Sequence, residues 1–307
     1  MLERKKESTI KTLLLALLVM ALWGTLFPMI KVGYSAFHIA TTDIPSIIVF
    51  AGTRFTLSGV FLIALEGVRQ KRIELPKKGN MPYVALGALS TIILHYSFTY
   101  IGLAVGEGSK GAIVKQVGVL FLSCFAFLFD KDDKFSVNKV IAGVLGFGGI
   151  IATAFDGTGF SLAFGDVLLL LASGCSSVGT VVTKKATQTL SPIKYTGYSQ
   201  LLGGIFLLSL GLLLGGRIRY ISIPAVLVFL YICGASIGAY IIWSSLLRTG
   251  SISRLSVIKF TEPLFAVIFS GMILGEHILK VSYLVAFVLL LLALLVEHRP
   301  RRLKNEG

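Results

Sequence analysis

Long apolar runs separated by short polar segments extend along the whole chain. Runs such as Val167–Leu171 and Leu289–Leu295 are continuously apolar, whereas a strand of a membrane barrel alternates apolar and polar positions. A helix that crosses a bilayer needs about 20 mostly apolar residues. The pattern therefore predicts an all-α membrane protein. We predict ten transmembrane helices, at residues 12–30, 44–65, 82–104, 110–129, 138–155, 165–183, 194–215, 222–247, 253–274 and 280–297.

The composition excludes other classes of protein. Of the 307 residues, 55% are hydrophobic and 14% charged, and the mean hydropathy is +0.85. Soluble domains are about one quarter charged. Disordered chains contain fewer apolar residues than folded domains do. A soluble enzyme, a disordered chain and a soluble domain with one membrane anchor are therefore excluded. Because Cys124, Cys175 and Cys233 lie in apolar runs, we expect buried thiols rather than a disulfide or a metal site.

The basic residues predict the orientation of the chain. Most of the 29 Lys and Arg lie in the N-terminal tail, the 66–81 and 130–139 loops and the C-terminal segment, all on one side of the predicted helices. Since cytoplasmic loops carry the excess of Lys and Arg, we expect a multi-pass protein of the cell membrane with both termini in the cytoplasm. The same placement, in short loops between helices, argues against nucleic acid as the partner.

The chain also resembles itself at an offset of 144 residues. Tyr96 aligns with Tyr240 and Lys115 with Lys259, and the alignment continues without a gap to Ala142 and Ala286. We therefore predict two five-helix repeats, at residues 1–155 and 160–300, and a cytoplasmic tail at 301–307. Because five is odd, the second repeat would enter the membrane from the opposite side. Inverted repeats are typical of secondary transporters, whose binding site lies near the midplane where the repeats meet.

Four charged residues fall well inside predicted helices, namely Arg54, Lys115, Lys259 and Glu262. Each costs roughly 2.5–3.5 kcal/mol at the bilayer centre, so it must face a wet cavity or a partner. Lys259 and Glu262 are three residues apart and can pair on one helix face. The remaining two positive charges favour a substrate with a carboxylate, phosphate or sulfate. Two alternatives stay open: Arg54 could bond helix-end carbonyls, and Lys115 could extend toward the interface.

Uncharged residues complete the candidate site. His95 could bind substrate or relay a proton, although it could also hydrogen-bond a neighbouring helix. Tyr96 and Tyr240 are related by the repeat and are suited to lining a substrate cavity. Pro28 and Pro263 fall inside predicted helices, where a proline removes one backbone hydrogen bond and permits a kink. We therefore expect both prolines to act as hinges.

Several short motifs resemble a known family. The chain contains Trp23-Gly24-Thr25-Leu26-Phe27-Pro28, then Gly165-Asp166 before an apolar run, then Thr261-Glu262-Pro263-Leu264-Phe265-Ala266-Val267-Ile268 and Leu274-Gly275-Glu276. Together these motifs resemble the EamA family of the drug/metabolite transporter superfamily over nearly the whole chain. The resemblance implies ten helices, cytoplasmic termini, a central cavity, alternating access and, for many members, export of metabolites such as amino acids. In the first repeat Val119 stands at the position of Pro263.

The leading functional hypothesis is a secondary transporter, expected to be an exporter, for a small organic metabolite that is anionic or resembles an amino acid. The alternatives are a flippase for a lipid or lipid carrier, and an enzyme embedded in the membrane. Enzymes usually show clustered His, Asp or Glu, and we interpret Asp130, Asp132 and Asp133 as a solvated turn. No phosphate-binding loop is present, so ATP is not expected as the energy source.

No cofactor and no metal are expected. Coupling to ions or protons, through Glu262 or His95, stays open beside substrate exchange and transport driven by the substrate gradient alone. The lipid bilayer and a small-molecule substrate are the expected partners. A monomer and a homodimer both fit the sequence.

Overall fold

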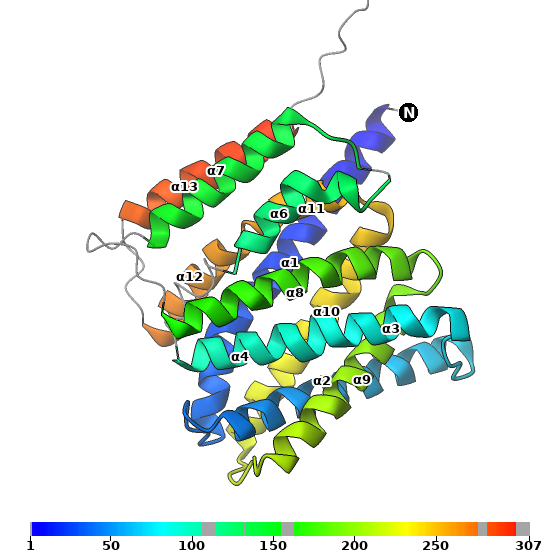
Figure 1. Ribbon diagram of the computed structural model, residues 1–307, viewed down its shortest axis with the longest axis vertical. Coiled ribbons are helices and arrows are strands. Elements are labelled where there is room, and N and C mark those ends of the chain that lie inside the picture. The colour runs from blue at the N-terminus through cyan, green and yellow to red at the C-terminus, as the bar shows by residue number, and fades with distance from the viewer. Residues whose placement is uncertain (1, 106–114, 132, 155–162, 276–280, 299–307) are drawn as a thin grey trace, which may run out of the picture.

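The computed structural model describes residues 2–105, 115–131, 133–154, 163–275 and 281–298, and these residues form helices without any β-strand (Figure 1). The longer helices are α1 (Leu2–Ala36), α2 (Ile44–Gln70), α4 (His95–Val105), α6 (Val117–Phe125), α7 (Val137–Ala154), α8 (Phe164–Thr187), α9 (Pro192–Leu213), α10 (Ile223–Thr249), α11 (Ile252–Lys259), α12 (Glu262–Leu274) and α13 (Val281–His298). The short elements are η1 (Lys78–Asn80), α3 (Met81–Gly87), the π-helical η2 (Ala88–Leu94) and η3 (Ala126–Leu128).

Seven helical segments of the described chain are long and apolar enough to cross a membrane. They are Ile10–Ala36, Ile44–Gln70, Lys78–Val105, Phe164–Thr187, Pro192–Leu213, Ile223–Thr249 and Ile252–Leu274. Three shorter apolar helices, Val117–Leu128, Val137–Gly149 and Leu284–Ala293, coincide with the other predicted spans. The prediction of a helical, multi-pass membrane protein is confirmed. The predicted tail at 301–307, Glu276 and the start of the predicted helix at 110–129 lie outside the described residues.

The helices pack in pairs that match when the two predicted halves are exchanged. α2 packs along α9, and α7 along α13 (Figure 1). α1 contacts α10 and α12, and the corresponding helix of the second half, α8, contacts α4 and α6. α6 in turn contacts α11. A helix of one half therefore meets a helix of the other in each of these contacts.

Glycines allow α2 and α9 to approach closely. They recur every seven residues, at Gly52 and Gly59 on α2 and at Gly197, Gly204 and Gly211 on α9. A Cβ atom at Gly59 would collide with the backbone of the facing helix at Leu201, and one at Gly204 with the backbone at Thr56. Small residues at such crossings let membrane helices pack tightly, so this pair forms a rigid edge of the molecule.

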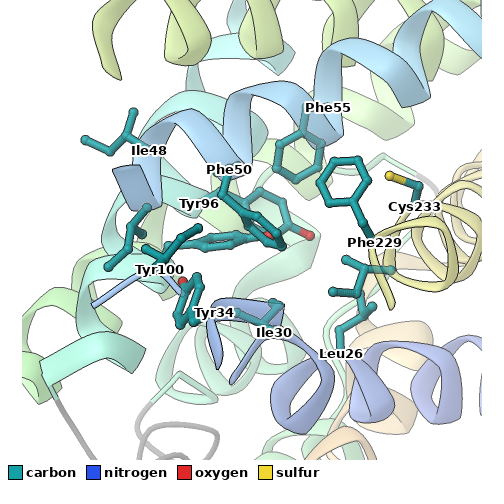
Figure 2. Close-up of a cluster of buried hydrophobic side chains, with 14 of the residues drawn as sticks. Leu26, Ile30, Tyr34, Ile48, Phe50, Phe55, Tyr96, Tyr100, Phe229 and Cys233 are labelled. Atoms are coloured by element: carbon teal, nitrogen blue, oxygen red, sulfur yellow. The ribbon is translucent and has the colours of Figure 1, made fainter. Parts of the chain in front are cut away.

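An aromatic core fills the space between α1, α2, α4 and α10 (Figure 2). The ring of Phe50 lies 5.3 Å from that of Phe229 and 5.7 Å from that of Tyr34, both in edge-on geometry. Phe55 lies 4.4 Å from Tyr96. Aromatic pairs of this kind add about 0.5–1.5 kcal/mol each beyond their burial. The cluster therefore holds Tyr96, a predicted cavity residue, in a fixed position.

Two aspartates of the loop after η3 are buried, and our interpretation of them as part of a solvated turn is wrong. Asp130 and Asp133 are 7% and 5% exposed, while Asp132 lies outside the described residues. Asp130 forms an ion pair of 3.0 Å with Lys184 at the end of α8. The reason is that Asp133 serves as a cap for a distant helix, which a local reading of the sequence does not reveal.

Asp133 ties this loop to the start of α11. Its carboxylate accepts hydrogen bonds from the Ser253 amide at 2.8 Å, from Ser253 Oγ at 2.7 Å and from Ser251 Oγ at 2.9 Å. It also pairs with Lys139. Burial alone would raise the pKa of Asp133, but the bonds from Lys139 and Ser253 hold it below its ordinary value. This contact joins the two predicted halves at one end of the molecule.

Candidate functional site

A central cavity lies between the two predicted halves. The volume that the centres of water molecules can occupy in this cavity is about 70 Å³. This is enough for on the order of five waters. Its walls come from α1, η2, α4, α8, α9, α10, α11 and α12, together with Lys115. The lining includes six of the seven predicted cavity residues: Lys115, Lys259, Glu262, His95, Tyr96 and Tyr240.

Each of the two lysines lies at or next to a helix end. α11 ends at Lys259 and α12 begins at Glu262. Pro263 lacks the N–H that would bond the carbonyl of Lys259 in a continuous helix, so the interruption follows from the sequence. Pro263 thus lies in the first turn of α12, where that missing N–H is tolerated, rather than at a kink inside one helix as we had expected.

In the first half, a helix begins next to Lys115 without a proline. α6 begins at Val117, directly after Lys115 and Gln116. Ser173 of α8 donates to the carbonyl of Lys115 and accepts from the amide of Gly118 at 2.7 Å. The first amide groups of a helix have no partner within it and are often satisfied by a side chain. Ser173 of the neighbouring helix satisfies backbone groups at the start of α6 in this way.

Both ammonium groups lie over aromatic rings in the cavity. Lys115 Nζ is 5.2 Å from the ring centre of Phe27. Lys259 Nζ is 5.4 Å from Trp23 and 5.9 Å from Trp243. Such cation–π contacts are worth about 0.5–2 kcal/mol, so the rings offset part of the cost of holding charge inside the membrane.

The expected ion pair between Lys259 and Glu262 is not formed among the described residues. Lys259 Nζ donates instead to Ser176 Oγ of α8 at 3.3 Å. Because α11 ends at Lys259 and α12 begins at Glu262, the three-residue spacing of one continuous helix no longer applies. Glu262, Lys115 and Lys259 nevertheless line the same cavity, and the same three also line a smaller adjoining one.

The two repeat-related tyrosines meet at the cavity wall. Tyr240 Oη donates to Tyr96 Oη at 2.9 Å, which joins α10 to α4. His95 precedes Tyr96 in the cavity wall and donates through Nδ1 to the carbonyl oxygen of Ala172 on α8, at 2.8 Å. That bond leaves Nε2 as the acceptor of the neutral imidazole. His95 thus combines the bond to a neighbouring helix with a place in the cavity lining.

Arg54 does not line the cavity. It is fully buried on α2, where its guanidinium donates to Tyr100 Oη and Ser236 Oγ and stacks 4.7 Å from the ring centre of Phe55. These bonds go to side chains rather than to the helix-end carbonyls we had considered. The positive surplus in the cavity is therefore one charge, from Lys115 and Lys259 against Glu262, rather than two.

Pro28 lies inside α1, one residue after the cavity residue Phe27. α1 continues through Pro28 to Ala36 without a break. Its proline is therefore within a continuous helix, unlike Pro263 at the start of α12.

Sequence reasoning missed several other neutral residues of the cavity lining. Trp23 and Trp243 are the two tryptophans of the chain, and both line the cavity. Hydroxyls on one face of α8 line it as well, at Ser176, Thr180 and Thr183. Their spacing of three or four residues inside an apolar run was a readable signal of a polar face.

The comparisons with known proteins agree with this architecture. A profile of the EamA-like transporter family matches residues 10–155 and 163–297. An uncharacterized transporter of Bacillus subtilis, YvbV, is 29% identical over 293 residues, covering 94% of this chain and 91% of its own. An S-adenosylmethionine/S-adenosylhomocysteine transporter of Chlamydia muridarum is 23% identical, covering 83% of this chain and 81% of its own.

A solved crystal structure shares the fold. It superposes with a TM-score of 0.71 and 17% sequence identity, over 94% of this chain and 96% of that one. The family and the relatives point to a transporter rather than an enzyme. On the match of both halves to the family profile, the chain belongs to the EamA-like transporter family, within the drug/metabolite transporter superfamily.

Proposed function

We propose that this protein is a secondary transporter, and an exporter, of a small organic metabolite that carries an anionic group. The observation that carries the proposal is that Lys115 and Lys259, at matching positions of the two halves, line one cavity. Lys115 Nζ makes no hydrogen bond or ion pair to the described residues, and Lys259 Nζ makes one bond, to Ser176. Both ammonium groups therefore keep donors for a carboxylate or phosphate.

Glu262 narrows the class of substrate. It supplies a carboxylate beside the two lysines in the same cavity, so an amino group on the substrate would find an acceptor there. A zwitterion resembling an amino acid satisfies both signs of charge at once. The aromatic rings of Trp23 and Trp243 would cover its apolar part. The Chlamydia relative is a transporter of S-adenosylmethionine and S-adenosylhomocysteine. Both compounds are amino-acid derivatives, which supports the same class of substrate.

The transport mechanism that we propose is alternating access between two inverted repeats, at residues 1–155 and 160–300. It is supported by the helix pairs that match when the halves are exchanged and by the helix ends next to both lysines. The proposal includes ten membrane-spanning helices, with both termini in the cytoplasm as the placement of the basic residues predicts. Glu262 and His95 are the groups through which we propose any proton coupling, because both are titratable and line the cavity.

The first experiment identifies a ligand and then removes the lysines. The purified protein is screened for thermal stabilisation by amino acids, organic acids and phosphorylated metabolites, since a ligand that binds the folded state raises its stability. Both tryptophans line the cavity, so quenching of their fluorescence gives the dissociation constant. We expect Lys115→Met or Lys259→Met to weaken binding about 10- to 100-fold, which corresponds to the loss of one hydrogen bond to a charged group. The double variant should abolish uptake into vesicles.

Lys185→Met is the matched control, because Lys185 lies on α8 and is exposed. It should bind and transport like the wild type. Undiminished transport by a folded double variant would refute the anion site. Flipping of a labelled lipid at the same rate in the wild type and the double variant would favour the flippase instead.

A further inference from the structure

The amide of Gln200 in the cavity wall is buried, and both of its polar atoms, Nε2 and Oε1, lack a hydrogen-bond partner among the described residues. Gln200 of α9 is 1% exposed and lines the cavity. Native proteins pair nearly all buried polar atoms, and a buried amide with both ends unpaired is costly. This residue is therefore suited to bind something that enters the cavity.

Other unpaired donors and acceptors surround the same space. Trp23 Nε1, Thr91 Oγ1 and Thr99 Oγ1 are buried without partners in the described chain, and all three residues line the cavity. The sequence makes room for one of them, because a Cβ at Gly179 of α8 would collide with Thr91 Oγ1. Thr91 also lies in η2, a π-helical segment, and such segments are frequent at functional sites.

This neutral region and the charged region belong to one cavity. The ring of Trp243 lies beneath the ammonium of Lys259. The next residue, Ser244, hydrogen-bonds Thr196 of α9 at 3.1 Å. Gln200 follows Thr196 by one helical turn, roughly 6 Å along α9. A single ligand of several bonds can therefore contact the lysines at one end and Gln200 at the other.

We propose that Gln200 forms a second recognition site for the substrate, specific for a neutral group that presents a donor and an acceptor side by side. A carboxamide, a lactam or the edge of a nucleobase has this pattern. Such a group makes two hydrogen bonds with the amide of Gln200, while the anionic group of the same molecule binds at Lys115 and Lys259. The inference rests on the proposed anion site and adds to it the second half of the substrate.

The test compares carboxylates that differ in one polar group. Succinamic, glutaramic and adipamic acids each carry a carboxylate and a carboxamide. Their partners 4-oxopentanoic, 5-oxohexanoic and 6-oxoheptanoic acids replace the amide nitrogen by a methyl group of similar size. Binding is followed by tryptophan fluorescence. At the length that spans the cavity, we expect the carboxamide to bind about tenfold more tightly than the ketone, as for one hydrogen bond gained from a buried partner.

Gln200→Leu and Gln200→Met should abolish this preference. They should weaken binding of the carboxamide more than that of the ketone, because the ketone makes only one of the two bonds to Gln200. They should also leave the unfolding temperature of the ligand-free protein equal or higher, because a group without partners has been removed. Equal binding of both series by the wild type, a preference that survives in Gln200→Leu, or a lower unfolding temperature would each overturn the inference. Binding of neither series to the wild type would overturn the anion site as well, whereas equal binding of both refutes Gln200 alone.

Discussion

At the scale of single residues, charges that look alike in the sequence have different environments. Lys115 and Lys259 line the cavity, whereas Arg54 is fully buried behind Tyr96 and bonded to Tyr100 and Ser236. Its guanidinium lies 5.4 Å from the ring centre of Tyr96. Arg54 therefore positions the cavity wall without contacting the cavity, and its replacement should affect stability more than binding.

Arg54→Lys tests this distinction. A lysine keeps the charge but cannot donate in two fixed directions as a guanidinium does, so one of the two hydroxyls loses its donor. We expect a loss of about 1.5–3 kcal/mol in stability, as for one hydrogen bond to a charged group, measured by thermal unfolding in detergent. The protein that remains folded should bind ligand like the wild type. Arg69→Lys, an exposed change on the same helix, is the control, and weak binding at normal stability would contradict the assignment.

At the scale of elements, the paired helices α2 and α9 depend on positions without a side chain. Because the glycines are seven residues apart, they lie on the faces by which α2 and α9 contact each other. By contrast, Gly174 of α8 has nothing within 4 Å of the place where a Cβ would lie. The same substitution should thus have opposite effects at the two places.

We expect Gly204→Ala to lower stability by about 1–3 kcal/mol, the usual cost of overpacking. Gly174→Ala should leave stability unchanged or raise it by up to about 1 kcal/mol, since alanine favours a helix over glycine. Thermal unfolding of the two variants side by side provides the measurement. Equal behaviour of both variants would show that the close approach of α2 and α9 does not limit stability.

At the scale of the whole molecule, the contact between Asp133 and Ser253 joins the predicted halves at one end. Alternating access requires contacts of this kind to separate during each cycle. Because the pKa of Asp133 is below its ordinary value, the contribution of its carboxylate to stability is present at neutral pH. It is lost only when the pH falls through that lowered value.

Joining the two positions covalently should stop transport. In a protein whose cysteines at 124, 175 and 233 are replaced by serine, Asp133→Cys with Ser253→Cys is treated with a short bifunctional thiol reagent. We expect loss of vesicle uptake after cross-linking and normal uptake before it, while each single cysteine variant stays active after treatment. Transport that continues in fully cross-linked protein would exclude movement at this contact.

The sequence by itself determined the class of protein, a helical membrane protein. The reason is that the length of an apolar run and the spacing of charges are local features of the chain. Helical membrane spans were predictable from the apolar runs, and the family from its short motifs. The candidate cavity residues were predictable from polar or charged side chains inside the spans and from the internal repeat. Pro263 likewise marked the interruption between α11 and α12.

Only the tertiary structure decided which polar groups meet. Ser173 bonds the start of α6, Asp133 caps α11 and Arg54 lies outside the cavity lining. Gln200 lines the cavity without a hydrogen-bond partner among the described residues. Each of these outcomes depends on a contact between residues far apart in the chain, or on the lack of one. The packing of helices sets such distances, and no local pattern of hydrophobicity or charge encodes them.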